Sequence, residues 1–223
     1  MTLEVNTKDA AAVSDSELVE MADTAASRQR GFEIGFLSKQ REHWVLSTCV
    51  LEQSRLRAWS FYSLERIGGT PCLLIGVAFI ESNAKSEQYL LSLLGGMYKK
   101  AVLAFPDEDV LVGTRIRDAR AFICLSGLDD IIPTPGHKPS GEERAWGRRL
   151  AKRFGADSQL DDRSFITQGS GEADGFLDFE GPKVEIDPTI ASQLDDLDFS
   201  RGDSLVVFGW AMTEDLQAGK LGK

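Results

Sequence analysis

The chain has 223 residues, a hydrophobic content of 42% and a formal net charge of -10 at pH 7. This hydrophobic content is sufficient for a packed core and excludes a disordered chain. The negative charge argues against a general nucleic-acid-binding protein, which needs a basic face. No apolar run approaches the roughly 20 residues of a membrane-spanning helix, and residues 1–11 contain no signal core, so we expect a cytoplasmic protein without membrane contact.

The cysteines and histidines give no sign of a metal site. Cys49, Cys72 and Cys124 lack C-x-x-C spacing and have apolar neighbours, which predicts reduced core residues. His43 and His137 are the only histidines, and neither has a cysteine or carboxylate at ligand spacing. We therefore expect no metal.

The first part of the chain predicts a flexible N-terminus over residues 1–13 and then a helix. This helix begins at Ser14 or Asp15 and ends near Ala26, because Asp15 or Ser16 can cap it and its apolar residues share one face. Residues 44–50 are rich in β-forming side chains and predict a strand. The apolar stretch 32–37 is left unassigned.

The middle of the chain predicts a hairpin followed by a long helix. Residues 56–65 alternate, Gly68 and Gly69 supply a turn, and residues 71–80 form a nearly continuous apolar strand. A helix then runs from a cap at Ser86 to about residue 104. It contains Gly95 and Gly96, which predict close packing against another segment.

Residues 109–116 predict a buried strand, and Asp118 can cap a helix over 119–125. A buried strand, a helix and a second buried strand form a βαβ unit with parallel strands. Further on, Ser140 and Glu143 predict a capping box for a helix that ends at Gly155, and short strands are expected at 163–168 and 205–209.

We expect a single α/β domain over residues 14–212, with a C-terminal extension from about residue 133 and a flexible tail at 213–223. The proline-rich loop 133–140 marks the start of the extension. The acidic stretch 157–203 is interpreted as a solvated surface.

The order of these elements resembles the acyl-CoA-binding fold of the GNAT superfamily of N-acetyltransferases. The resemblance covers about residues 14–128, with a final strand at 205–209, and includes the strand-turn-helix pattern DVLVGTRIRDARAF at 109–122. It implies an α/β (α+β) fold with a central mixed sheet flanked by helices. It also implies a cofactor, acetyl-CoA or another acyl-CoA, bound between two splayed parallel strands.

The resemblance places the cofactor phosphates at the loop after strand 73–80, where the family has Q/R-x-x-G-x-G/A. Glycines allow the backbone to approach phosphate at a helix N-terminus. This chain has Glu81-Ser-Asn-Ala-Lys-Ser86 instead, without glycine. The expected cofactor-binding residues are donors of this loop and residues at the carboxyl end of the next parallel strand: Asn83, Lys85, Ser86, Thr114 and Arg115. An ion pair with one of the many acids is the alternative for Arg115.

The resemblance also implies catalytic roles. A glutamate near the end of strand 73–80 can act as general base, which makes Glu81 the candidate; the alternative is an exposed residue at a strand end. The family's tyrosine acid has no clear counterpart, since Phe122 and Cys124 stand in its place. Tyr89 and Tyr98 lie on the preceding helix.

Three functions stay open. The first is an acyl-CoA-dependent N-acyltransferase acting on an amine of a small molecule or a protein. The second is a catalytically inactive GNAT-like scaffold that binds a partner, favoured by the missing glycines. The third is an unrelated α/β enzyme with Arg115 and Asp118 as ligand contacts.

Overall fold

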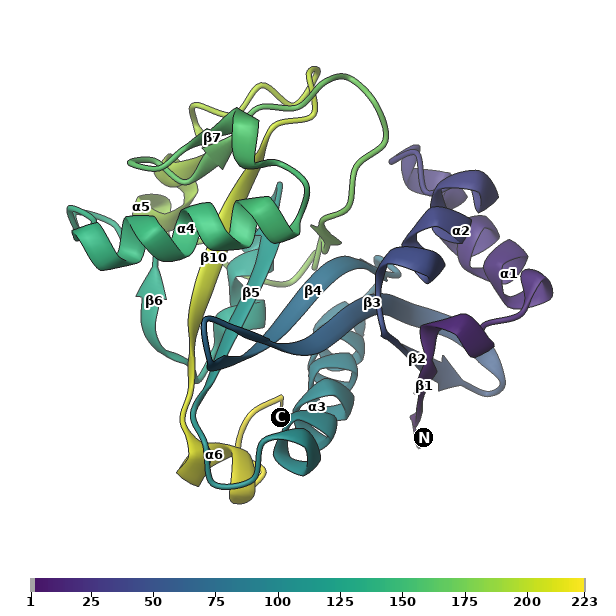
Figure 1. Cartoon of the computed structure of the whole chain (residues 1–223). Helices are drawn as coiled ribbons and strands as arrows, with labels where there is room; N and C mark the ends of the chain where they lie inside the picture. The colour runs from purple at the N-terminus through teal and green to yellow at the C-terminus, as the bar shows by residue number, and fades with distance from the viewer. Residues whose placement is uncertain (1–2, 223) are drawn as a thin grey trace.

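A ten-stranded mixed sheet forms the centre of the computed structural model, which describes residues 3–222 (Figure 1). The strand order is β1-β2-β3-β4-β9-β5-β10-β8-β7, and β6 also pairs with β10. The strands are β1 (Glu4–Asp9), β2 (Leu46–Glu52), β3 (Arg55–Ile67), β4 (Thr70–Ile80), β5 (Val110–Ile116), β6 (Asp129–Ile132), β7 (Leu160–Asp161), β8 (Ile166–Thr167), β9 (Leu177–Asp178) and β10 (Ser204–Ala211).

Helices cover both faces of this sheet (Figure 1). Helices α1, α2 and α4 pack on one face, while α3, η3 and α6 lie on the other. The predicted mixed α/β sheet flanked by helices is confirmed. The helices are α1 (Asp15–Ala25), α2 (Ile34–His43), α3 (Ser86–Ala104), α4 (Gly141–Arg153), α5 (Pro188–Ala191) and α6 (Thr213–Gln217), with 3-10 helices η1 (Ala10–Ala12), η2 (Ala26–Arg28), η3 (Ala119–Leu125), η4 (Asp157–Gln159) and η5 (Ser192–Leu194).

The N-terminal segment differs from the expectation of a flexible end. Residues 4–9 form the edge strand β1, paired antiparallel with β2. The predicted first helix is confirmed as α1, although its cap is Ser14, which forms a capping box with Glu17. The unassigned stretch continues into a helix, α2, in which only Leu37 is fully buried. That weak apolar pattern gave no helical periodicity to detect.

The predicted hairpin and long helix are confirmed as β3, β4 and α3. The two helix glycines do lie against other segments: a Cβ at Gly96 would lie 2.7 Å from Val5 Cγ1, and one at Gly95 would lie 3.2 Å from the Gly222 carbonyl oxygen. The predicted cap was wrong. Lys85 is the N-cap of α3, without a side-chain capping bond.

The predicted parallel direction of the two strands of the βαβ unit is confirmed, but the helix predicted after the second strand is of another type. Strands β4 and β5 pair in parallel. Residues 119–125 form the 3-10 helix η3 rather than an α-helix, with the Asp118 side chain accepting from Arg120 N as its cap. The capping box of Ser140 and Glu143 at α4 is confirmed.

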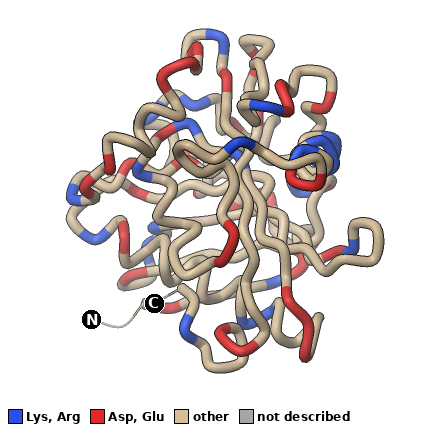
Figure 2. Tube along the Cα trace, turned by 90° about the vertical axis from the view of Figure 1, so that its left-hand side faces the viewer, with Lys and Arg blue, Asp and Glu red and all other residues tan. Residues whose placement is uncertain are grey.

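The C-terminal third contains short elements that the sequence did not reveal. Strands β6, β7 and β9 were not predicted, and the expected strand 163–168 is reduced to β8. The tail, expected to be flexible, contains α6, with Leu216 and Leu221 buried against the body of the protein. In the view of Figure 2, acidic and basic positions are interspersed along the chain trace.

Candidate functional site at the divergence of two parallel strands

Strands β4 and β5 diverge partway along their length. Their parallel register runs from Cys72 opposite Leu111 to Ile75 opposite Thr114 and ends there. At the same point β4 contains a bulge, because Gly76 has no partner between Ile75 and Val77 in the pairing with β3. Bulges redirect a strand and are common beside functional sites.

Glycine is required at this bulge by the indole of Trp44. A Cβ on residue 76 would lie 1.8 Å from Trp44 Cε2, well inside contact distance. The ring is held in place by a hydrogen bond from its Nε1 to Gln40 Oε1 at 2.9 Å. The bulge, and with it the divergence of the sheet, is therefore fixed by side-chain packing.

The gap beyond the bulge is occupied by the chain itself. Strand β9 lies between β4 and β5 and pairs in parallel with both: Leu177 is opposite Ala78 and Ile116. The Ala78 amide donates to the Phe176 carbonyl oxygen at 3.1 Å. The gap implied by the GNAT resemblance therefore exists, and residues 174–180, called the gap segment below, fill it.

Ion pairs hold the gap segment at both ends. Arg115 on β5 forms a bidentate pair with Asp174. Arg28 Nη1 lies 3.0 Å from Asp178 Oδ2, and Arg30 Nη2 donates to Glu180 Oε1 at 2.5 Å. Burial raises the pKa of Asp178, while the nearby arginines act in the opposite direction.

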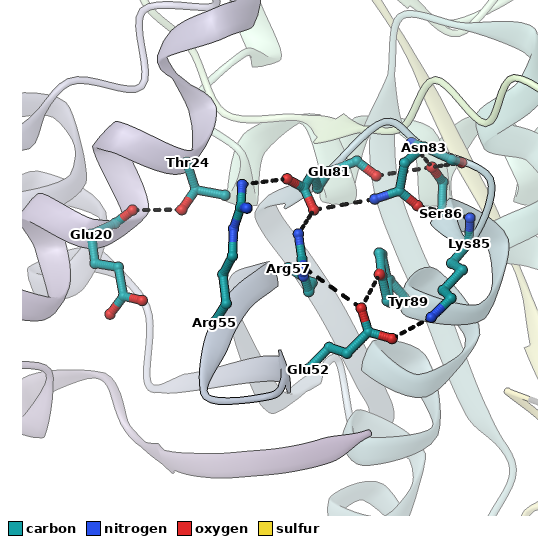
Figure 3. Close-up of polar contacts among 10 residues, drawn as sticks. All are labelled: Glu20, Thr24, Glu52, Arg55, Arg57, Glu81, Asn83, Lys85, Ser86 and Tyr89. Carbon is teal, nitrogen blue, oxygen red and sulfur yellow. Dashed lines mark hydrogen bonds and ion pairs between the residues drawn. The ribbon is translucent and has the colours of Figure 1, made fainter. Parts of the chain in front are cut away.

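Glu81, the predicted base, follows β4 and is surrounded by donors (Figure 3). Arg57 Nη1 donates to Oε2 at 2.5 Å, Arg55 Nη2 donates to Oε1 at 3.0 Å and Asn83 Nδ2 donates to Oε2 at 3.2 Å. Its side chain is 22% exposed. Glu81 is therefore not a fully exposed residue at a strand end, and three side-chain donors already bind its carboxylate.

A second carboxylate, Glu52 at the end of β2, lies beside Glu81 and was not predicted. Lys85 Nζ and Tyr89 Oη donate to its two oxygens at 2.5 and 2.9 Å. These two hydrogen bonds lower the pKa of Glu52. Arg57 Nη2, 3.6 Å from Glu52, connects the two carboxylates into one network (Figure 3).

The predicted cofactor loop is closed on itself. Asn83 Oδ1 accepts from the Lys85 amide at 2.7 Å, and the Ser86 hydroxyl accepts from the Asn83 amide at 2.7 Å. Ser86 is 1% exposed. The structure brings Asn83, Lys85 and Ser86 together with Glu81, as expected, but their polar atoms contact the loop and Glu52.

Thr114 and Arg115 lie at the divergence point, apart from that loop. The Thr114 hydroxyl donates to the Ile75 carbonyl oxygen at 2.9 Å, across the last paired position of β4 and β5. Arg115 pairs with Asp174, which is the kind of ion pair named above as the alternative to a cofactor contact. Both residues are almost completely buried.

The residues considered for the acid that protonates the departing thiolate are all buried. Cys124 is buried, and burial raises its pKa to about 12. Tyr98 is also buried, with no hydrogen-bond partner for its hydroxyl. Tyr89 is bound to Glu52, and burial is the main cause of its raised pKa.

Within residues 3–222, no cluster of three or more His, Cys, Asp or Glu residues could hold a metal ion. No helix in that range is long and apolar enough to span a bilayer.

The residues missed by sequence reasoning act through non-local contacts. Glu52 and Arg57 looked like ordinary strand residues, and only the pairing of β2 with β3 brings them to Glu81. The gap segment had one weak local signal: three apolar residues, Phe176, Leu177 and Phe179, between Gly175 and Gly181.

A search of solved structures finds similar chains. The aminoglycoside 6'-N-acetyltransferase from Enterococcus faecium is 12% identical, with a TM-score of 0.40 over 50% of this chain and 61% of that chain. Escherichia coli ElaA is 15% identical, with a TM-score of 0.37 over 63% of this chain and 95% of that chain. This chain thus spans about three fifths of the length of the acetyltransferase. No family model and no curated protein matches the sequence.

The fold is a mixed α/β sheet flanked by helices. Its order of helices, hairpin, buried strand, helix and parallel strand is the order on which the resemblance to the GNAT superfamily rests. Parallel strands that meet at one end and separate at the other give the sheet an internal edge. In this protein that edge is paired with the gap segment.

Proposed function

We propose that the protein is an acyl-CoA-dependent N-acyltransferase that binds its donor between β4 and β5. The observation that carries the proposal is the divergence of these strands beyond Ile75 and Thr114, at the bulge of Gly76. The carboxyl ends of parallel strands are the usual ligand edge of an α/β sheet. The gap segment has to leave this edge before an acyl-CoA enters it.

Glu81 is the proposed base. The acceptor amine of a small molecule or protein attacks the thioester carbonyl carbon, the carbon–sulfur bond breaks, and the nitrogen loses a proton to Glu81. The thiolate takes up a proton and leaves as a thiol, so the products are an amide and free CoA. Arg55, whose side chain is 69% exposed, is the partner of Glu81 that solvent can most easily replace.

The proposed donor contacts are Asn83, Lys85, Ser86, Thr114 and Arg115. An acyl-CoA carries several phosphate charges, and guanidinium and ammonium groups form strong charge-assisted hydrogen bonds with such groups. For Arg115 the phosphate would replace the Asp174 carboxylate, and for Lys85 it would replace Glu52. The donor therefore competes with internal ion pairs.

A second function, a non-catalytic GNAT-like scaffold that binds a partner, is favoured by one specific observation. Strand β9 completes the sheet at the place where a donor would lie, and the buried ion pair of Arg28 with Asp178 holds it there. The loop without glycine and the missing acid agree with this candidate.

Calorimetric titration with acetyl-CoA separates the two functions. The N-acyltransferase predicts saturable binding, tighter in Asp174→Asn because Arg115 is then released from its internal carboxylate. Absence of binding in both proteins at about 1 mM ligand contradicts it and supports the scaffold. In an assay of free thiol release with polylysine and small primary amines, Glu81→Gln should lower the rate by about 10²–10⁴-fold while acetyl-CoA binding is retained.

A further inference from the structure

Four arginines gather where the gap between β4 and β5 opens to solvent. Arg28 and Arg30 come from the connection between α1 and α2, and Arg115 and Arg117 come from the end of β5. Three of them meet carboxylates of the gap segment: Arg28 meets Asp178, Arg30 meets Glu180 and Arg115 meets Asp174.

Arg117 is the member of this group without an acidic partner. Among residues 3–222, no carboxylate oxygen lies within 4.0 Å of its guanidinium nitrogens, whereas each of the other three arginines has one within that distance. Its Nη2 donates to the Gly202 carbonyl oxygen at 2.7 Å, and its Nε is buried without a hydrogen-bond partner. The positive charge of Arg117 is therefore only partly satisfied inside the protein.

Packing over an aromatic ring does not by itself account for this residue. Its guanidinium lies 4.0 Å from the centre of the Phe176 ring. Arg28, Arg66 and Arg153 also lie over rings, and each of them additionally has a carboxylate partner. Arg149 lies over the Trp146 ring without an ion pair to any described residue, but its side chain is exposed to water, whereas Arg117 is partly buried. Burial, together with the charges of Arg115 and Arg30, lowers the pKa of Arg117 to about 10, while Asp174 and Asp178 act in the opposite direction. Arg117 is therefore charged at neutral pH.

Arg117 also borders open space. A hollow of about 210 Å³ is lined by Arg30, Arg117, Asp118, Phe176, Leu177, Asp178 and Phe199. Phe199 is 58% exposed, an unusual position for a phenylalanine with arginines beside it. The carboxylate of Asp118 is taken up by Arg120 and by the backbone of η3. The other carboxylate of the lining, Asp178, pairs with Arg28 and Arg30. The hollow thus offers two guanidinium groups and an exposed aromatic wall.

We propose that Arg30 and Arg117, with Phe199 as a wall, form a binding site for a phosphate group at the end of β5. A planar guanidinium binds two phosphate oxygens at once, and a phosphate has enough oxygens to accept from two guanidinium groups together. Glu180 occupies the Arg30 half of the site in this structure. The site needs no thioester chemistry, so it stands apart from the acyl transfer proposed above.

Pyrophosphate is the probe, titrated calorimetrically into the full chain at low salt. We expect one saturable site in the wild type and at least about tenfold weaker binding in Arg117→Gln, since charge-assisted hydrogen bonds are lost. Arg66→Gln is the control. Arg66 also lies over a ring, but it pairs with Glu108, and neither residue lines the hollow. Equal binding by both variants, or no binding by the wild type, overturns the proposal.

A gain of affinity gives a test that does not depend on a destabilised variant. Glu180→Gln removes the nearer of the two carboxylates that pair with Arg30, the other being Asp178 at 3.6 Å, and the Glu180 side chain is 30% exposed, so folding should be preserved. We expect its pyrophosphate affinity to rise about threefold or more. Unchanged or weaker affinity contradicts the assignment of Arg30 to the site. A titration with acetyl-CoA alongside separates this result from the fate of the acyltransferase proposal.

Discussion

Arg28 Nη1 lies 3.0 Å from Asp178 Oδ2, and both side chains are more than nine-tenths buried. The pair joins the connection between α1 and α2 to the strand that fills the gap between β4 and β5. A buried ion pair contributes little to net stability when intact, but losing one partner leaves an uncompensated charge. This pair therefore controls how firmly the gap segment stays in place.

Arg28→Gln should lower the free energy of unfolding by about 3 kcal/mol at neutral pH. Asp178, whose pKa burial already raises, then has a still higher pKa. A folded-state pKa above the unfolded value makes folding more favourable as pH falls, so the loss should shrink at about pH 5 relative to about pH 8. Urea unfolding at both pH values measures this.

The control for that variant is Arg148→Gln, which removes an ion pair with Asp162 at a side chain that is 55% exposed. Exposed pairs contribute about 1 kcal/mol or less. If both variants unfold at the same urea concentration as the wild type, the Arg28 pair does not anchor the gap segment.

Gly76→Ala should destabilise the protein by about 3 kcal/mol, because the added methyl group overlaps the Trp44 ring at the bulge. Gly35→Ala is the matched control. A Cβ at Gly35, near the start of α2, meets nothing within 4 Å, so alanine should stabilise by up to about 1 kcal/mol through helix propensity. Thermal unfolding that shifts equally in both variants would disprove the packing explanation of the bulge.

Asp203 should make stability depend on pH in the acid range. Its carboxylate accepts from Arg201, Gly169 N and Asp198 N, and these contacts lower its pKa to about 2. The unfolded chain binds this proton first, so the stabilisation is complete above about pH 4 and disappears towards pH 2; its size is at most about 2 kcal/mol. Asp203→Asn should lack this part of the pH dependence. An unchanged acid limb in the variant would contradict the assignment.

The three thiols should be unreactive in the folded protein. Cys72 and Cys124 are buried as expected, whereas Cys49 is only half-buried at the edge of the core. Desolvation nevertheless raises the pKa of Cys49, Cys72 and Cys124 to about 12, 11 and 12. Because the thiolate is the reacting species, a chromogenic disulfide reagent at about pH 8 should modify none of them until guanidinium unfolds the chain. Rapid modification of a thiol in the native protein would show that the core around it opens.

The sequence was informative where the local pattern and the tertiary structure agree. The glycine turn of the β3–β4 hairpin, the βαβ order and the Ser140–Glu143 capping box all have short-range signals, and all are present. Strand β1 has a polar sequence and gains its structure from pairing with β2 at the sheet edge. No hydrophobic alternation marks such a strand.

The site was predictable only in part for the same reason. Loop 81–86 follows directly from the end of β4, so its members could be named. Arg115 and Asp174 are separated by 59 residues, and neither sequence neighbourhood points to the other. Strand β9 fills the gap through two residues, Leu177 and Asp178. They pair with β4 and β5, which are distant in the sequence.

Hydrogen–deuterium exchange of the gap segment, with and without about 1 mM acetyl-CoA, tests most directly whether β9 occupies a ligand site. The account predicts faster exchange of residues 174–180 on acetyl-CoA binding, because the donor takes their place, while the paired residues Cys72 to Ile75 of β4 stay protected. Binding of acetyl-CoA with unchanged or slower exchange of residues 174–180 would contradict it.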